Sequence, residues 1–336
     1  RDYYASRGLG DVYKRQMMQY LKREMDGTAS EADLARLAKA RATDTDWMDL
    51  MTQTGFLQEH SVSVSGGSDK TRFFISGSYL TQQGILKKSS LDRYSTRFNI
   101  DHKATKWLDL GLKATVGYSK TNFADPEAGA GRQNWGNPWF TTLLAYPYES
   151  PDDWYNVDNP TLITKYYDRE TGRLKTVASV YAKASITDWL SVKTNFGLDF
   201  MYNRNVSTLH RDHPNAQQNH GYYGQTSSEL FRYTWTNTIN VNKDFANGHS
   251  LNAVAGMEMF QGKWYTSNFT GYDLNSDMMQ SPAGIGDKSG SSLFPPSIGG
   301  GRTMSNLMSF FAQASYSIAN KYNFSACLLY TSPSPR

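Results

Sequence analysis

Cysteine is almost absent from this chain of 336 residues, which has a single one, Cys327. A lone cysteine excludes an intrachain disulfide framework and a cysteine-ligated metal site. Long apolar runs are also missing, and no segment reaches the ~18–20 apolar residues that a transmembrane helix needs. The sequence has no G-x-S-x-G, H-E-x-x-H or convincing paired-carboxylate motif, so we expect no enzyme.

The two ends of the chain are related to each other through the genetic code. One permitted back-translation of CLLYTSPSPR, residues 327–336, has a reverse complement that encodes RGLGDVYKR, residues 7–15, without a mismatch. This indicates one DNA element read on both strands, and it looks like the transposase-end adapter of a sequencing library. The alternative is a real inverted repeat in a gene. We expect residues 1–16 and 327–336 to be adapter-derived and to pack on nothing.

Charge is nearly balanced once these ends are set aside. The ends carry five basic and two acidic residues, namely Arg1, Arg7, Lys14, Arg15, Arg336, Asp2 and Asp11. Removing this net of +3 lowers the formal net charge of the chain from +4 to +1. The composition therefore gives no reason to expect a nucleic-acid partner.

Hydrophobic periodicity separates a short helical segment from a long β region. Residues 17–42 are rich in good helix formers, and Ser30 with Asp33 has the spacing of a capping box, so we expect a helical segment over residues 17–45. From Trp47 onward apolar and polar residues alternate, which is typical of strands with one apolar and one polar face. The alternation is clearest at 94–101, 108–118, 180–186, 190–200, 231–242 and 251–259.

The connections between these strands alternate between short and long. Short turns at 66–71, 104–107, 187–189, 246–249 and 319–322 take turns with longer segments at 81–92, 124–172, 205–226 and 275–303. Strands of ten or more residues joined in this way are typical of an outer-membrane barrel, whereas strands of a soluble sandwich run only ~5–6 residues. The predicted fold is all-β: residues 46–326 form about ten strands of a large plugged transmembrane antiparallel β-barrel, a partial barrel.

The alternation also assigns the two faces of each strand. Within residues 190–200 we expect Val192, Phe196 and Leu198 to face lipid, and Lys193, Asn195 and Asp199 to face the lumen. Arg93, Arg97 and Asp101 share one face and are placed to pair across the lumen. Trp107 and Trp189 each follow a short turn, where an aromatic girdle at the inner lipid interface is expected; ordinary core packing is the alternative.

Two blocks of sequence are more specific than this pattern. The first has TDW at 45–47, HSVSVSGGS at 60–68, QGI at 83–85, RY at 93–94 and RFN at 97–99; the second reads SFFAQASYSIANKYNFSA, residues 309–326. Both resemble the SusC/RagA family of TonB-linked outer-membrane proteins, the TonB-dependent receptors of Bacteroidetes. The resemblance places residues 17–45 just after a first barrel strand.

The resemblance implies active import of a large nutrient, a glycan or oligosaccharide and sometimes a peptide, across the cell outer membrane. It also implies a SusD-like lipoprotein as an external lid and the TonB-ExbB-ExbD complex as the energy source. It implies no cofactor. The family's signal peptide, TonB box and plug have no counterpart in this sequence, so energy coupling is expected from the resemblance alone.

One long connection has the composition of a ligand-binding loop. Within residues 132–167, six aromatic residues stand among Asn, Asp and Pro: Trp135, Trp139, Tyr146, Tyr148, Trp154 and Tyr155. Flat aromatic faces beside carboxylates suit sugar rings, which stack their C–H bonds and hydrogen-bond their hydroxyls. The alternative is that these aromatics pack the loop on itself, on the plug or on the lid.

Three other clusters carry weaker signals. His210, His213 and His220 lack the carboxylate at fixed spacing that a metal site needs, and Asp152, Asp153 and Asp158 miss the EF-hand pattern, so we expect no metal. The glycine-rich segment 284–302 follows no strand-to-helix switch, so a phosphate loop is not expected.

Three classes of function fit these observations to different degrees. The leading hypothesis is the energised outer-membrane importer. A passive barrel, such as a porin or adhesin, would share the strand pattern but lack a plug and TonB box. A soluble carbohydrate-active β protein would use the same aromatics and acids, but it would stay soluble without detergent.

Overall fold

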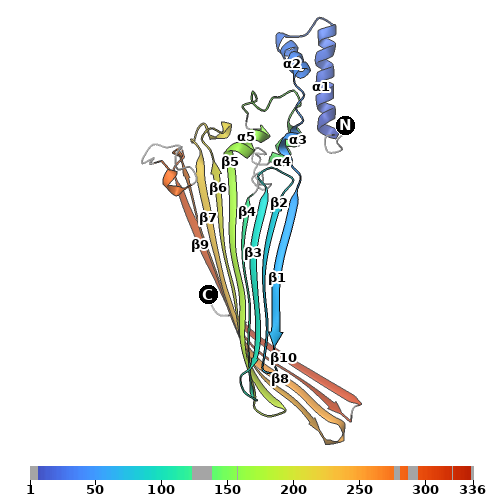
Figure 1. Cartoon of the computed structure of the whole chain (residues 1–336), viewed down its shortest axis with the longest axis vertical. Helices are drawn as coiled ribbons and strands as arrows, with labels where there is room; N and C mark the ends of the chain where they lie inside the picture. The colour runs from blue at the N-terminus through green and yellow to red at the C-terminus, as the bar shows by residue number, and fades with distance from the viewer. Residues whose placement is uncertain are drawn as a thin grey trace.

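The computed structural model describes residues 7–122, 138–156, 158–275, 281–286, 294–319 and 321–333. Within them ten antiparallel strands form one open sheet in chain order. Figure 1 shows a long, curved sheet with helices and long connections at one end and short turns at the other. The strands are β1 (Phe56–Gly67), β2 (Thr71–Gln83), β3 (Ser90–Lys103), β4 (Leu108–Asn122), β5 (Tyr167–Ser185), β6 (Leu190–Leu209), β7 (Tyr222–Phe245), β8 (His249–Tyr272), β9 (Ser297–Ile318) and β10 (Tyr322–Pro333).

This architecture confirms the predicted partial antiparallel barrel, but its strands are longer than the alternation indicated. β7 and β8 have 24 residues each. The strands also continue into segments that we predicted as connections, including 167–172, 205–209 and 222–226. In these parts both faces carry polar residues, so the period of two that reveals a strand is lost. Among the described residues, no helix is long and apolar enough to cross a membrane.

The N-terminal segment is helical, as predicted, with α1 (Arg7–Met25) and α2 (Glu31–Ala42). The capping box is present, because the Asp33 amide donates to Ser30 Oγ at 3.1 Å and the Ser30 amide donates to Asp33 Oδ2 at 3.2 Å. The strand pattern predicted from Trp47 is wrong at its start. Residues Trp47–Met51 form α3, capped by Asp46, which accepts from the Asp49 amide at 3.0 Å, and β1 begins only at Phe56.

The prediction that the ends pack on nothing is wrong for residues 327–333, which extend β10 along β9, from Cys327 opposite Gln313 to Pro333 opposite Leu307. Residues 7–15 form the first part of α1. A free strand edge offers a row of N–H and C=O groups that pairs with almost any sequence, so this pairing follows from the backbone. The side chains gain little cover, since Leu328 is 68% exposed.

The registers keep two distinct faces across the sheet. Successive side chains of a strand point to opposite faces, and the ladders align equal faces of neighbouring strands. One row reads Phe73, Ile100, Leu112, Val180, Phe196, Trp235, Met259 and Met308. The adjacent row on the other face reads Arg72, Asp101, Gly111, Tyr181, Asn195, Thr236, Glu258 and Ser309. We call these the lipid face and the lumen face.

The lipid face has an aromatic border towards the long connections, and two tryptophans stand at the short turns. Trp107 and Trp189, 54% and 38% exposed, precede β4 and β6, and Lys243 Nζ of the lipid face lies 4.7 Å from the centroid of the Trp189 ring. Towards the long connections the border is formed by tyrosines: Tyr79, Tyr94, Tyr118, Tyr202 and Tyr233. Tyr118 lies 11 residues after Trp107, and Tyr202 lies 13 residues after Trp189. About 12 residues at ~3.3 Å each, on strands tilted by ~40°, span about 30 Å, the thickness of the hydrocarbon layer.

On the lipid face, charged residues lie almost entirely outside the band between the tyrosines and the short turns. Between the tyrosines and the short turns, the described strands place no Asp, Glu, Lys or Arg on this face except Lys243, which lies close to the turn after β7. Beyond the tyrosines, charged residues appear at once: Asp92, Lys120, Glu170, Arg204, Glu229, Lys263 and Arg302. The strands therefore cross the membrane with their lower parts and project past it with their upper parts.

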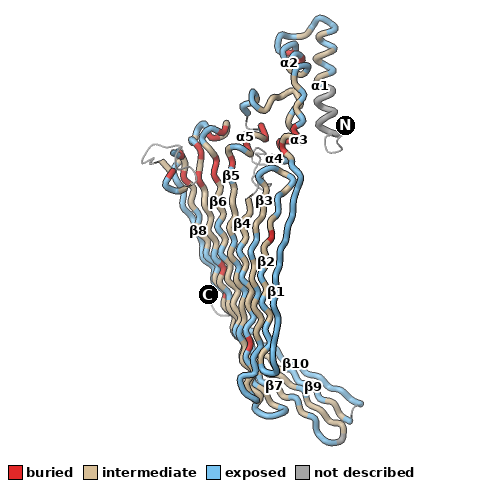
Figure 2. The backbone as a smooth tube through the Cα atoms, in the orientation of Figure 1, coloured by how far each residue is buried: buried red, intermediate tan, exposed pale blue. Residues whose placement is uncertain are grey.

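Burial is concentrated above this membrane band. Figure 2 shows the buried positions gathered at the tops of the strands and in the connections, while β1 and the lower turns are exposed. A compact cluster there consists of Ile163, Tyr167, Leu209 and Ala216, with Tyr222 packed against it. This cluster packs the start of β5 against the end of β6 and the start of β7, below the long connections.

Candidate functional site

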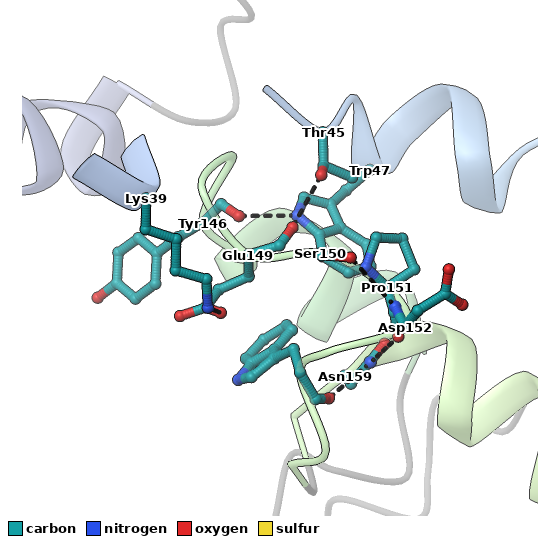
Figure 3. A network of polar contacts seen from close by, with 10 residues as sticks. Lys39, Thr45, Trp47, Tyr146, Glu149, Ser150, Pro151, Asp152 and Asn159 are labelled. Atoms are coloured by element: carbon teal, nitrogen blue, oxygen red, sulfur yellow. Dashed lines mark hydrogen bonds and ion pairs between the residues drawn. The ribbon is translucent and has the colours of Figure 1, made fainter. Parts of the chain in front are cut away.

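The candidate site is built where the chain before β1 meets the connection between β4 and β5. That connection contains α4 (Pro138–Leu144) and α5 (Pro160–Tyr166), joined by residues 145–159. Figure 3 shows the polar contacts that hold the two segments together. Lys39 of α2 forms an ion pair with Glu149, with Nζ and Oε2 2.5 Å apart. The Thr45 amide donates to the Pro147 carbonyl at 2.7 Å.

Trp47 is the anchor of this junction. It is only 4% exposed, and its Nε1 donates to the Tyr146 carbonyl at 2.9 Å. The Trp154 ring meets the Trp47 ring edge-on, with centroids 5.6 Å apart and planes at 66°. A buried tryptophan with a satisfied N–H gives a large apolar contact and a fixed orientation, so α3 holds residues 146–154 in place.

Asn159 closes the loop from the other side. It is fully buried, and its Nδ2 donates to the carbonyls of Pro151 and Trp154 at 3.0 and 2.8 Å. Its Oδ1 accepts from the Thr161 amide at 3.0 Å and so caps the start of α5. One side chain thus satisfies buried groups of the loop and of the helix, which makes residues 150–161 a compact unit.

The six predicted aromatics fall into different environments. Trp135 lies outside the described residues. Trp154 packs on Trp47, and Tyr146 stacks on Tyr148 with centroids 5.1 Å apart. Tyr155 donates from its hydroxyl to the Asp212 carbonyl at 2.9 Å, but 56% of the residue is exposed; Trp139 on α4 is 36% exposed. The structure thus brings Trp47 into the cluster, which sequence reasoning missed, and leaves Trp139, Tyr146 and Tyr155 partly exposed.

A cavity of about 610 Å³ lies beside this unit at the tops of β3 to β7. Its lining is rich in charge: Lys88, Asp168, Arg169, Glu170 and Arg204. Lys88 Nζ lies 2.7 Å from Asp168 Oδ1, and Glu170 pairs with Lys120 at 2.8 Å. The lining residues come from several elements that are far apart in sequence, so no local sequence motif predicts the cavity.

The three histidines of the β6–β7 connection do not converge. His210 lies against the Tyr166 ring, with centroids 5.2 Å apart, and His220 Nδ1 contacts Asp273 Oδ1 at 2.8 Å. His213 is fully buried and its Nδ1 accepts from the Asn215 amide at 3.1 Å. In the part of the chain that the structure describes, no group of three His, Cys, Asp or Glu residues is placed to hold a metal ion.

The acidic and glycine-rich segments have local roles where they are described. Asp152 and Asp158 donate their amides to Ser150 Oγ and Asn156 Oδ1, at 3.4 and 3.1 Å. Within segment 284–302, residues 287–293 lie outside the described residues, and residues 297–302 belong to β9. Half of the described part of that segment is therefore strand.

The sequence is similar to those of several TonB-dependent receptors. No family model matches the sequence. A TonB-dependent receptor of Formosa agariphila is 30% identical over 168 residues, covering 46% of this chain and 16% of that protein. Another from the same organism is 21% identical over 285 residues, covering 84% and 27%. The TonB-dependent receptor SusC of Bacteroides thetaiotaomicron is 27% identical over 129 residues, covering 35% and 12%.

The fold agrees with a solved transporter. The structure of the RagAB peptide transporter superposes with a TM-score of 0.70 at 19% identity, covering 87% of this chain and 33% of that one. The chain thus spans between 12% and 27% of the length of the curated relatives quoted above. These relatives are named as receptors and a transporter, which confirms the expectation that the chain is not an enzyme.

Proposed function

We propose that this chain, a section of an outer-membrane TonB-dependent receptor barrel of the SusC/RagA kind, serves the active import of large nutrients. The observation that carries the proposal is the sheet itself. Ten long antiparallel strands have one face that carries almost no charge over about 30 Å and another face that carries most of the charged residues of the same stretch. Strands of this kind suit a wide barrel with a wet lumen, through which a large solute passes.

The proposed cargo is a glycan or oligosaccharide, with a peptide as the second candidate. The partly exposed aromatic residues Trp139 and Tyr155 favour a sugar, since the same loop also supplies carboxylates in sequence. The peptide candidate is favoured by the fold-level likeness to a peptide transporter. We further propose a SusD-like lipoprotein as the external lid and the TonB-ExbB-ExbD complex as the energy source.

Energised import is tested in cells that express the full-length gene product containing this chain. Uptake of labelled oligosaccharides should stop when tonB is deleted and return when it is restored, with the barrel still present in the outer membrane. Uptake that continues without TonB would identify a passive porin. A full-length product that stays soluble without detergent would identify a soluble β protein instead.

The aromatic loop is tested with single substitutions in the same full-length product. Trp139→Ala should weaken oligosaccharide binding by ~1 kcal/mol or more and leave barrel assembly intact, because it removes an exposed stacking face. Trp154→Ala should instead raise the protease sensitivity of residues 145–159, because it removes the contact with Trp47. We extend the first expectation to Trp135, the remaining aromatic of the loop. Unchanged affinity after both Trp135→Ala and Trp139→Ala would leave the loop a structural cover.

A further inference from the structure

The lumen face has an uneven distribution of charge that the import function alone does not explain. From the row of Arg93 down to the row of Asp101, the lumen face of β3 and β5 carries four basic residues: Arg93, Arg97, Arg173 and Lys175. All four are exposed. The acidic residues of the lumen face on β3 and β4, Asp101 and Asp109, lie further down, close to the short turns.

These residues form the two walls of a groove, and β4 forms its floor. Arg93 and Arg173 stand in one ladder row on either side of Ser119, and Lys175 stands beside Gly117 in the next row on this face. Arg97 stands beside Thr115 in the row after that. Since neighbouring strands lie ~4.8 Å apart, the two walls are about 10 Å apart across a floor of small residues. We call these seven residues the basic groove.

The positive charge of the basic groove is only partly compensated by the protein. Arg93 lies 3.9 Å from Glu59 on β1, with both side chains 49% exposed. Arg173 donates from Nε to Asn203 Oδ1, a neutral group, at 2.9 Å. Among the described residues, Arg97 and Lys175 form no ion pair; the acidic neighbour on the far side is Asp199 of β6. Further up the same face of β5 stands Arg169; the cavity of about 610 Å³, which we call the rim cavity, lies mainly on the opposite face, since Asp168, Glu170 and Arg204 line it.

Basic side chains of one sign along a concave wall concentrate anions from solution, and Arg matches the planar carboxylate with two parallel hydrogen bonds. The floor adds hydroxyl groups at Ser119 and Thr115, which suit the hydroxyls of a sugar. We propose that the basic groove is a binding track for acidic oligosaccharides, that is, sugars with carboxylate or sulfate groups. This inference deepens the proposed import function and rests on it.

The binding test uses the purified full-length gene product in detergent, with no energy source. The probes are oligogalacturonate and oligomannuronate, each compared with the same oligosaccharide after reduction of its carboxylates to alcohols. Calorimetry at low salt should show that at least one acid binds roughly tenfold tighter than its reduced form. The preference should shrink at high salt, because exposed charge pairs are screened.

Gly117 allows a matched pair of variants that differ only in charge. A Cβ at this position would meet nothing closer than 3.7 Å, so the floor accepts a side chain. Gly117→Asp should weaken binding of the acidic probe roughly tenfold, whereas the equally large Gly117→Asn should change it by about twofold at most. The double variant Arg173→Gln/Lys175→Gln should also lose the preference, while Lys263→Gln, on the opposite face above the membrane, should keep it.

Several results would overturn the proposal. One is equal affinity for the acidic and reduced probes, or no binding of either acid. Another is a double variant Arg173→Gln/Lys175→Gln that binds the acidic probe as tightly as the unmodified protein but conducts more ions in planar bilayers. That result would show that the basic side chains hold a domain inside the lumen and do not bind the sugar. Binding of an aspartate-rich peptide but of neither acidic sugar would replace the glycan by a peptide. TonB-dependent uptake without any charge preference would keep the import function and reject the groove.

Discussion

At the scale of single residues, the lumen face depends on close contacts between aromatic rings and glycines. The Tyr181 ring lies over Gly111, and its hydroxyl donates to Asp101 Oδ1 at 2.7 Å. Phe311 covers Gly256 in the same way, since a Cβ on that glycine would lie 2.5 Å from the ring. A ring that covers a glycine shields the exposed backbone of the strand and fixes the position of the partner that it bonds. Asp101 is thus held by a tyrosine from two strands away, rather than by Arg93 or Arg97 as the strand pattern indicated.

Gly111 is therefore expected to be sensitive to even the smallest side chain. In Gly111→Ala the added Cβ would lie 2.0 Å from Tyr181 Cε1, so the ring must move and its hydrogen bond to Asp101 is lost. We expect a loss of about 1–3 kcal/mol in the free energy of unfolding, measured by denaturant titration of the full-length barrel in liposomes. Gly117→Ala is the control, because its nearest neighbour is 3.7 Å away. Equal effects of the two variants would contradict this contact.

The two faces of β6 give a second test at single residues. Phe196 lies on the lipid face between Val180 and Trp235, and Asn195 lies on the lumen face between Tyr181 and Thr236. Phe196→Arg should destabilise the barrel by roughly 2–4 kcal/mol, because it puts a charge near the bilayer midplane. Asn195→Arg should cost much less, since a lumen side chain stays in water. The free energy of unfolding of both variants is measured by the same denaturant titration. An equal loss of stability in Phe196→Arg and Asn195→Arg would show that the two faces are wrongly assigned.

At the scale of elements, the helices and connections above the membrane are held mainly by buried polar groups. α3 is anchored through Trp47, the loop before α5 through Asn159, and the short helix η3 (Pro214–Ala216) through His213. Each of these side chains bonds backbone groups and is at most 4% exposed. A buried side chain of this kind holds its loop only while its own protonation state and conformation are preserved.

His213 makes the β6–β7 connection sensitive to acid. Burial lowers the pKa of His213 to about 4, from an ordinary value near 6.5. Between these two values the unfolded loop takes up a proton that the folded loop refuses, so the stability of the loop falls as pH drops and is unaffected above the ordinary pKa. The loss should reach at most about 3 kcal/mol near pH 4. Limited proteolysis of residues 205–221 should become faster on acidification.

The control for this pH dependence is His213→Asn. Asparagine keeps an oxygen that can accept from the Asn215 amide but does not titrate, so the acid sensitivity should flatten. An unchanged pH profile in this variant would assign the effect to another group.

How far the sequence predicts these elements depends on where they lie relative to the membrane. Inside the apolar band, one face of each strand meets lipid and the other meets water, so alternation at residues 190–200 predicts both the strand and its faces. Above the band that contrast vanishes, and the extension of β6 to Leu209 was missed. The anchor Trp47 was also missed, because its partners lie 99 and 107 residues away in the chain and no local pattern connects them. The rim cavity was missed for the same reason.

At the scale of the whole molecule, the chain is a curved, open section of an outer-membrane barrel, with free edges at β1 and β10 among the described strands. Its strands cross the membrane between the tryptophan and tyrosine borders and then project beyond it. The rim cavity and the aromatic loop lie beyond the tyrosine border, whereas the basic groove runs from Arg93 at that border down to Arg97 on its membrane side.

The ends of the chain make a prediction about its gene. We propose that residues 1–16 and 327–336 are adapter-derived, although part of each is helical or strand-forming here. Reads of this locus from a library prepared without transposase adapters should continue in frame past Ala326 into different sequence. Recovery of CLLYTSPSPR in such reads would show that it is encoded by the gene.

The most direct test of the account is the environment of β6 in the full-length product in outer-membrane vesicles. Single spin labels would be placed at successive positions from 190 to 206, and their relaxation by oxygen and by a water-soluble nickel chelate compared. We predict a period of two from 190 to 200, with oxygen favoured at Phe196 and Leu198 and the chelate favoured at Asn195 and Asp199, and access to the chelate on both faces beyond Tyr202. Access of the chelate to Phe196 and Leu198 as well would contradict a membrane-spanning barrel wall.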